Sequence, residues 1–189
     1  MQQRILTSLL AFALISLLGN AQDLYPKNES VDVKNYVFAL HLNDDNNEIQ
    51  GEAQISVTFK DQAVPFALDL IQKSGEFGME ITEVLDNGSA ANYTYSENRI
   101  NIVPKNTASK TQTFTIKYHG IPERGLVIST TKYGNRSFFG DNWPNLARHW
   151  LPSVDHPYDK ASVEFQITAP EHYDVVATGK KVEESNLEN

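Results

Sequence analysis

The richest chemistry in the sequence lies in residues 145–162, NLARHWLPSVDHPYDKAS, which combine two histidines and two aspartates with an arginine and a lysine. Imidazole and carboxylate groups are the usual zinc ligands and the usual general acids and bases. His149 and His156 could approach each other across a loop, with Asp155 or Asp159 as a further metal ligand. Ordinary hydrogen bonding within the loop would use the same residues, and the spacing requires neither arrangement.

None of the compact motifs that mark a catalytic site is present in the sequence. A hydrolytic zinc site places two histidines one helical turn apart with a glutamate beside the first, and none of the five histidines has a partner at that spacing. The chain has no cysteine, and no serine lies in a Gly-x-Ser-x-Gly turn. The residues alone therefore predict no catalytic residue and no metal ligand set. Arg148 with Asp155, and Asp159 with Lys160, are expected instead to form ion pairs that fix the loop.

The elements that must position this loop are strands. From Asn35 onward the apolar residues alternate with period two, which is typical of strands buried on one face. Residues 36–42 and 49–59 flank a polar turn at 44–48, so we expect them to pair as antiparallel neighbours. Further strands are predicted at 66–70, 79–85, 93–95, 99–103, 113–118, 125–130, 161–168 and 173–178. No segment keeps a helical stripe, and the pattern indicates an all-β sandwich or an open barrel.

The first 21 residues have the composition of a secretory signal peptide. Arg4 precedes an apolar run at 9–18, and small residues follow up to Ala21. We therefore expect an exported protein, periplasmic or extracellular, whose residues 22–189 form one domain. The apolar run is shorter than the about 20 residues that a membrane span requires, so no membrane span is expected after signal cleavage.

The amino-acid composition argues against one class of partner and against disulfide bonds as a source of folding stability. The net charge of −8 and the pI near 5.1 argue against a nucleic-acid partner, because affinity for a phosphate backbone depends on Lys and Arg. An exported chain without cysteine has no disulfide framework. The domain must therefore depend on its hydrophobic core.

Residues 147–161, ARHWLPSVDHPYDKA, resemble a segment of a known family. They are similar to the Ala-Arg-x-x-Phe-Pro-Cys-x-Asp-x-Pro-x-x-Lys-Ala signature in the N-terminal domain of zinc aminopeptidases of the aminopeptidase N family, with Ser153 in place of the usual cysteine. The matching signature positions are Arg148, Pro152, Asp155, Pro157 and Lys160. Similar flanking segments occur in the same order, so the resemblance extends from about residue 36 to 179.

The resemblance implies a fold and a function. In this family the N-terminal domain is an antiparallel, saddle-like β-sandwich that covers one side of the active-site cleft. The zinc site belongs to a following catalytic domain, which this chain does not reach. The resemblance thus implies the first domain of a zinc metallo-aminopeptidase that acts on peptides with a free N-terminus, with the zinc held outside this segment. The alternative is a stand-alone secreted β-sandwich that binds a peptide, a carbohydrate or a partner protein without catalysis.

One departure from the family pattern affects the candidate substrate site. Many members place a Glu or Gln five residues before the position of Arg148, where it binds the substrate amine, but this chain has Trp143 there. Either Asp141 or Asn142 takes that role, or the ring of Trp143 lines a substrate pocket. A tryptophan packed in the core is the remaining alternative. In the signature itself, Arg148, Asp155 and Lys160 are expected to tie the loop to its neighbours.

Overall fold

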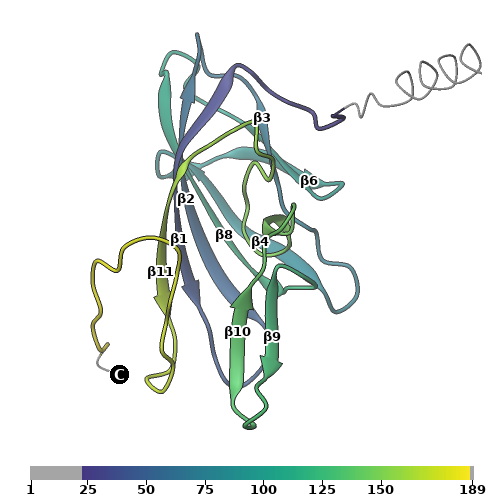
Figure 1. The fold of residues 1–189 in the computed structure, drawn as a ribbon. Coiled ribbons are helices and arrows are strands. Elements are labelled where there is room, and N and C mark those ends of the chain that lie inside the picture. Colours follow the sequence, from purple (N-terminus) through teal and green to yellow (C-terminus); the bar gives the residue numbers. More distant parts are fainter. Residues whose placement is uncertain (1–22, 188–189) are drawn as a thin grey trace, which may run out of the picture.

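The computed structural model describes residues 23–187, so the predicted signal peptide lies outside the described residues. In this part of the chain the regular elements are strands and one short 3₁₀ helix (Figure 1). In chain order they are β1 (Val31–His41), β2 (Ile49–Phe59), β3 (Phe66–Asp69), β4 (Gly78–Asp86), β5 (Ser89–Ala90), β6 (Asn92–Ser96), β7 (Arg99–Val103), β8 (Thr111–Ile121), β9 (Leu126–Thr130), β10 (Arg136–Gly140), η1 (Ala147–His149) and β11 (Ser162–Thr168).

The strands form three sheets. The largest has six strands in the order β11-β1-β2-β8-β4-β5, a second has the order β3-β7-β6, and β9 and β10 form a hairpin. The predicted antiparallel pairing of 36–42 with 49–59 is confirmed, with Tyr36 opposite Ile55. The edge strand β11 differs from the antiparallel expectation, because it runs parallel to β1. A parallel pair needs a long connection, and the segment between β10 and β11 is the last part of that connection.

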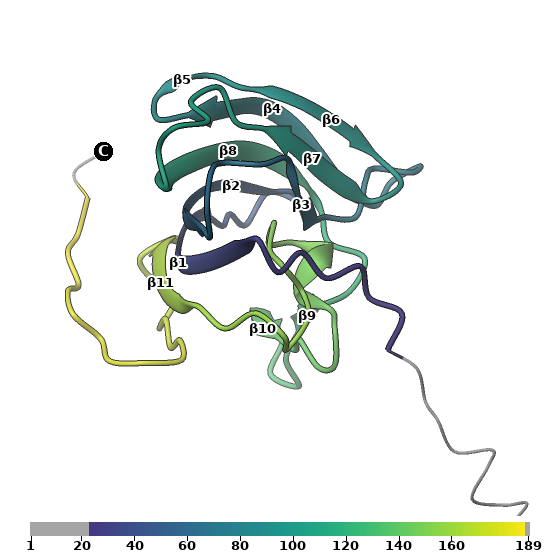
Figure 2. The same cartoon turned by 90° about the horizontal axis from the view of Figure 1, so that it is seen from above.

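The hydrophobic core lies between the six-stranded and the three-stranded sheets, which face each other in the view from above (Figure 2). Phe66 of β3 places its ring 4.9 Å from that of Phe114 of β8, in an edge-to-face arrangement. Ile100 and Ile102 of β7 are fully buried in the same core. The alternation along β2, in which every second residue from Ile49 is buried, explains why its other face stays polar. The predicted class, an all-β sandwich, is confirmed.

Among the described residues one predicted strand is absent, and the strands β5 and β10 were not predicted. Residues 173–178 were expected to form a strand, but they adopt no regular structure, and Val176 is 94% exposed. The strand β10, with the sequence RSFFG, was not predicted, because its two adjacent phenylalanines break the alternation that marks a half-buried strand.

Candidate functional site

The loop between β10 and β11, residues 141–161, is here called the signature loop. It is held against the end of β3 as if it were a further strand. Ser153 and Asp69 exchange backbone hydrogen bonds of 2.7 and 3.2 Å, and the N–H of Ile71 donates to the carbonyl of Arg148 at 2.8 Å. Because Arg148 in η1 and Ser153 after it are both tied to the segment at the end of β3, this part of the loop has a fixed position. The side chains of the loop therefore point either into the sandwich or toward solvent.

Arg148 and Asp155 form the ion pair that the sequence predicted. Nε of Arg148 donates to Oδ2 of Asp155 at 2.9 Å, and Nη2 donates to the backbone carbonyl of Asp155 at 3.0 Å. The backbone N–H of Arg148 donates to the same carboxylate at 3.2 Å. Both side chains are largely buried. The ion pair and its hydrogen bonds join the two ends of the turn formed by residues 148–155.

A second carboxylate, Asp69, completes this network and was missed from the sequence. Its side chain is 4% exposed and accepts hydrogen bonds from the Tyr25 hydroxyl and from the backbone N–H of Asp155. Arg99 lies 3.5 Å and Arg148 3.7 Å from its oxygens. A buried charge is tolerated only when it is paired. The charged residue in the middle of the apolar run Leu68-Asp69-Leu70 was the signal that could have revealed the network.

Replacement of Arg148 by alanine should destabilise the domain. The change leaves the carboxylates of Asp69 and Asp155 with fewer partners in a poorly hydrated place, and we expect a loss of about 1–3 kcal/mol in the free energy of unfolding. Urea denaturation measures this loss. Lys34→Ala, at an exposed strand position, is the matched control. Equal unfolding midpoints for Arg148→Ala and the unaltered chain would contradict a stabilising role for the network.

Asp159 and Lys160 do not form the expected ion pair among the described residues. Asp159 accepts a hydrogen bond from the backbone N–H of Val33 at 3.2 Å, and burial raises the pKa of its carboxyl group. Lys160 is exposed. Among the described residues Lys160 forms no ion pair that would tie the loop to its neighbours, and Asp159 makes the contact with β1.

The two tryptophans of the loop have opposite environments. Trp150 is 7% exposed and lies in the core, whereas Trp143 is 83% exposed. The alternative in which Trp143 packs in the core is therefore wrong. Nε1 of Trp150 donates to Oδ1 of Asn142 at 2.9 Å, so the amide of Asn142 is engaged in holding the buried ring. The carboxylate of Asp141 is exposed and accepts only the weak bond from the Trp143 N–H at 3.4 Å.

An apolar surface adjoins this end of the loop. Val127 and Phe139 are directly opposite each other in the β9–β10 hairpin, so their side chains lie on one face. They are 46% and 64% exposed, and Tyr133 at the tip of the hairpin is 78% exposed. We call the surface of Val127 and Phe139 the aromatic face, and Trp143 follows three residues after the end of β10. Neighbouring exposed apolar side chains of this size are typical of interaction surfaces.

The two loop histidines are not brought together as ligands of one metal. Nδ1 of His149 lies 3.8 Å from Glu123, and burial lowers the pKa of this ring. His156 instead pairs with Asp23, at 3.3 Å from Nε2. Residues 23–187 contain no cluster of three or more His, Asp or Glu side chains arranged to hold a metal ion. The described residues therefore do not fit a zinc site.

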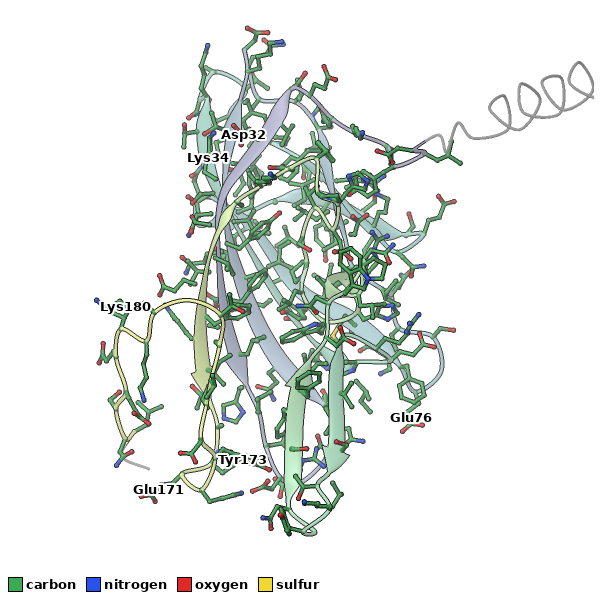
Figure 3. All side chains as sticks on the ribbon, in the orientation of Figure 1. Asp32, Lys34, Glu76, Glu171, Tyr173 and Lys180 are labelled. Atoms are coloured by element: carbon green, nitrogen blue, oxygen red, sulfur yellow. The ribbon has the colours of Figure 1, made fainter. Side chains whose placement is uncertain are left out.

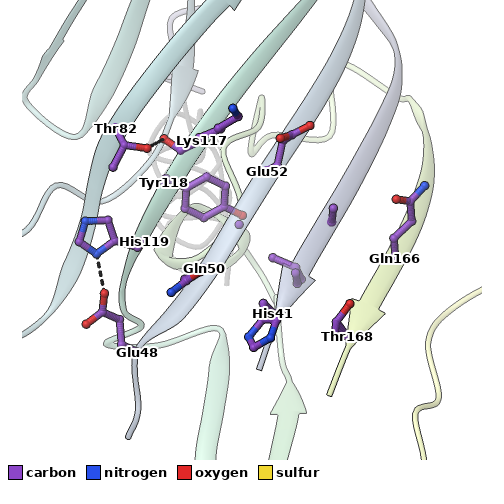
Figure 4. Close-up of a pocket in the computed structure, with 13 residues that line it drawn as sticks. His41, Glu48, Gln50, Glu52, Thr82, Lys117, Tyr118, His119, Gln166 and Thr168 are labelled. Atoms are coloured by element: carbon purple, nitrogen blue, oxygen red, sulfur yellow. Dashed lines mark hydrogen bonds and ion pairs between the residues drawn. The ribbon is translucent and has the colours of Figure 1, made fainter. Parts of the chain in front are cut away.

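A shallow hollow of about 610 Å³ lies on the outer face of the six-stranded sheet (Figure 4). Its polar groups are largely paired with one another or with their neighbours. His119 lies between Glu48, at 2.6 Å, and Glu80, at 3.6 Å, and Lys117 pairs with Glu83 at 2.8 Å. This face is a solvated sheet surface, and the signature loop with the aromatic face remains the candidate site.

A family model described as the peptidase M1 N-terminal domain matches residues 32–189. The chain therefore belongs to the peptidase M1 family, through its N-terminal domain. The part of the chain that the structure describes contains no helix that is long and apolar enough to cross a membrane. A comparison with curated protein sequences gave no match.

Solved structures share this fold. The M1 zinc metallopeptidase from Deinococcus radiodurans is similar, with a TM-score of 0.68 and 18% identity over 83% of this chain and 36% of that one. A mutant of that enzyme bound to a Tyr-Ser-Ala substrate matches with a TM-score of 0.68 and 19% identity over 84% of this chain and 37% of that one. Native yeast leukotriene A4 hydrolase gives a TM-score of 0.72 and 17% identity over 90% of this chain and 29% of that one. The chain thus spans only about a third of these proteins.

Proposed function

We propose that this chain is the N-terminal, substrate-facing domain of an exported zinc metallo-aminopeptidase that removes N-terminal amino acids from peptides. The observation that carries the proposal is the family match over residues 32–189. The zinc and the residues that act on the peptide bond are assigned to a catalytic domain beyond this segment, where a metal ion would polarise a water molecule. No chemical step is assigned to the residues of this chain. Residues 1–21 would act as the signal peptide that directs export to the periplasm or the outside of the cell.

The role proposed for this domain is to complete the substrate cleft. Asp141 has an exposed carboxylate with free oxygen lone pairs, so it can accept the ammonium group of a peptide N-terminus. Trp143 offers an exposed ring against which an apolar side chain of the peptide can pack. Asn142 is the weaker candidate for the ammonium group, because its amide oxygen is already bonded to Trp150.

The aromatic face supplies a contact for the catalytic domain. Val127 and Phe139 point outward from the β9–β10 hairpin, next to the start of the signature loop. An apolar patch of this kind is expected to be covered in the intact protein. Contact of the catalytic domain with Val127 and Phe139 would place Asp141 and Trp143 at the rim of the cleft between the two domains.

The test is enzymatic and uses the full-length protein purified from its own cells. We expect it to release amino acids from aminoacyl-4-nitroanilides and to lose this activity with a zinc chelator. Asp141→Asn should lower kcat/KM by about tenfold to a hundredfold through a higher KM, because a charge-assisted hydrogen bond is lost. Asp45→Asn, in an exposed turn, is the matched control. Absence of chelator-sensitive hydrolysis would contradict the proposed function, and an unchanged KM for Asp141→Asn would contradict only the role of Asp141.

A second candidate function is a stand-alone secreted binding module. The exposed side chains of Tyr133, Phe139 and Trp143 favour it, because aromatic side chains on a rigid β scaffold also serve to bind peptides and carbohydrates. The two candidates differ in one respect: only the aminopeptidase requires a further domain with a zinc site.

A further inference from the structure

The N-terminal segment before β1, residues 23–28, lies against the end of the sandwich that carries the signature loop (start of the coloured ribbon in Figure 1). We call it the N-terminal strap. Among the residues that the structure describes, no backbone–backbone hydrogen bond joins residues 23–27 to another element. Side-chain contacts hold the strap in place, so it can leave without breaking a strand ladder.

Tyr25 is the central contact of the strap. Its hydroxyl donates a hydrogen bond of 2.5 Å to Oδ2 of Asp69, the oxygen that also accepts the backbone N–H of Asp155. Burial and the neighbouring Asp69 carboxylate raise the pKa of the Tyr25 hydroxyl, which favours the protonated, hydrogen-bond-donating form. One oxygen of a nearly fully buried carboxylate thus joins the strap to the signature loop.

A second contact comes from His156 of the signature loop. Its ring stacks on that of Tyr25, with the centroids 4.5 Å apart and the planes at 18°. Nδ1 of His156 accepts the backbone N–H of Tyr158 at 3.2 Å, so the neutral ring carries its proton on Nε2. That nitrogen faces Oδ1 of Asp23 at 3.3 Å. His156 therefore binds the strap with both its ring face and its edge.

We propose that the N-terminal strap is a latch for the signature loop, and that lifting Tyr25 from Asp69 loosens the loop while the six-stranded sheet stays folded. Local openings cost less free energy than global unfolding where few backbone bonds must break. The strap has none to break in residues 23–27, whereas β2 and β8 are paired along nearly their whole length. Trimming of a few residues from the amino end would remove the latch and free the loop that carries Asp141 and Trp143.

This inference does not depend on the proposed peptidase function, and hydrogen exchange of the full-length protein purified from its own cells tests it. Tyr25→Phe keeps the ring and removes only the hydroxyl. We expect the backbone amides of Arg148 and Asp155 to exchange about tenfold to a hundredfold faster, the range that corresponds to a hydrogen bond to a charged group. In both the unaltered chain and Tyr25→Phe, these two amides should exchange faster than those of β2 and β8, because β2 and β8 open only on global unfolding.

Tyr173→Phe is the matched control, because the hydroxyl of Tyr173 also donates to an aspartate, Asp44, at 2.5 Å. Figure 3 labels Tyr173 near the turn of the β9–β10 hairpin, away from the strap. This variant should leave the amides of Arg148 and Asp155 unchanged. Asp23→Ala, a milder change to the strap, should produce a smaller rise at the same two amides. Unchanged rates at both amides in Tyr25→Phe, or exchange of these amides as slow as that of β2 and β8, would overturn the latch.

Discussion

Replacement of Asp69 by alanine is expected to lower the free energy of unfolding by about 3–5 kcal/mol, since removal of one partner leaves buried charges uncompensated. Arg99 and Arg148 both lie within 4 Å of this carboxylate, with side chains 27% and 22% exposed. The change also removes the acceptor for the N–H of Asp155 and for the hydroxyl of Tyr25. Urea denaturation followed by tryptophan fluorescence measures the loss, because Trp150 of the signature loop is buried.

Asp69→Asn separates the charge of this residue from its shape. The amide keeps one acceptor oxygen but cannot neutralise two arginines, so we expect a loss smaller than that of the alanine variant but still clear. Asp32→Ala is the control, because Asp32 is exposed and pairs only with its neighbour Lys34, and such pairs contribute little. Equal unfolding midpoints for the Asp69 and Asp32 variants would show that the Asp69 network does not stabilise the domain.

Phe66→Ala is expected to cost a similar amount, about 3–5 kcal/mol, because the change leaves a cavity between the two sheets. Phe66 is 4% exposed, and its ring lies 4.9 Å from that of Phe114 and 6.0 Å from that of Phe59. The same denaturation experiment measures the effect. Val103→Ala is the control in the same sheet, because Val103 is 46% exposed. A loss as small as that of the control would mean that the three-stranded sheet does not depend on this aromatic cluster.

Much of the fold could be predicted from periodicity. In β2 and β8 every second residue is buried on one face, and both were located from that pattern. The segment 173–178 has similar β-forming residues, yet in the described structure it is not part of a sheet. β propensity reflects packing against a neighbouring strand, and a linear pattern does not show whether that neighbour exists. The parallel pairing of β11 with β1 could not be predicted either, because the alternation of apolar residues does not show whether a strand runs parallel or antiparallel to its neighbour.

Only part of the candidate site could be predicted from the sequence. Arg148 and Asp155 lie seven residues apart and could be paired from their types and from the family signature. Asp69 and Tyr25 lie far from them in the sequence, and only the docking of β3 and the N-terminal strap brings them together. The exposure of Trp143 and the burial of Trp150 also follow from tertiary packing.

The central claim is that this domain works as part of a zinc aminopeptidase, and the mass of the native protein tests it most directly. An antibody raised against residues 23–187 would identify the protein in its own cells by immunoblot, and intact mass spectrometry would give its mass. We expect a mass several times the 21.2 kDa of this chain, because the solved relatives are covered by it over only 29–37% of their length. A native mass at or slightly below 21.2 kDa would contradict the aminopeptidase and would favour the stand-alone binding module.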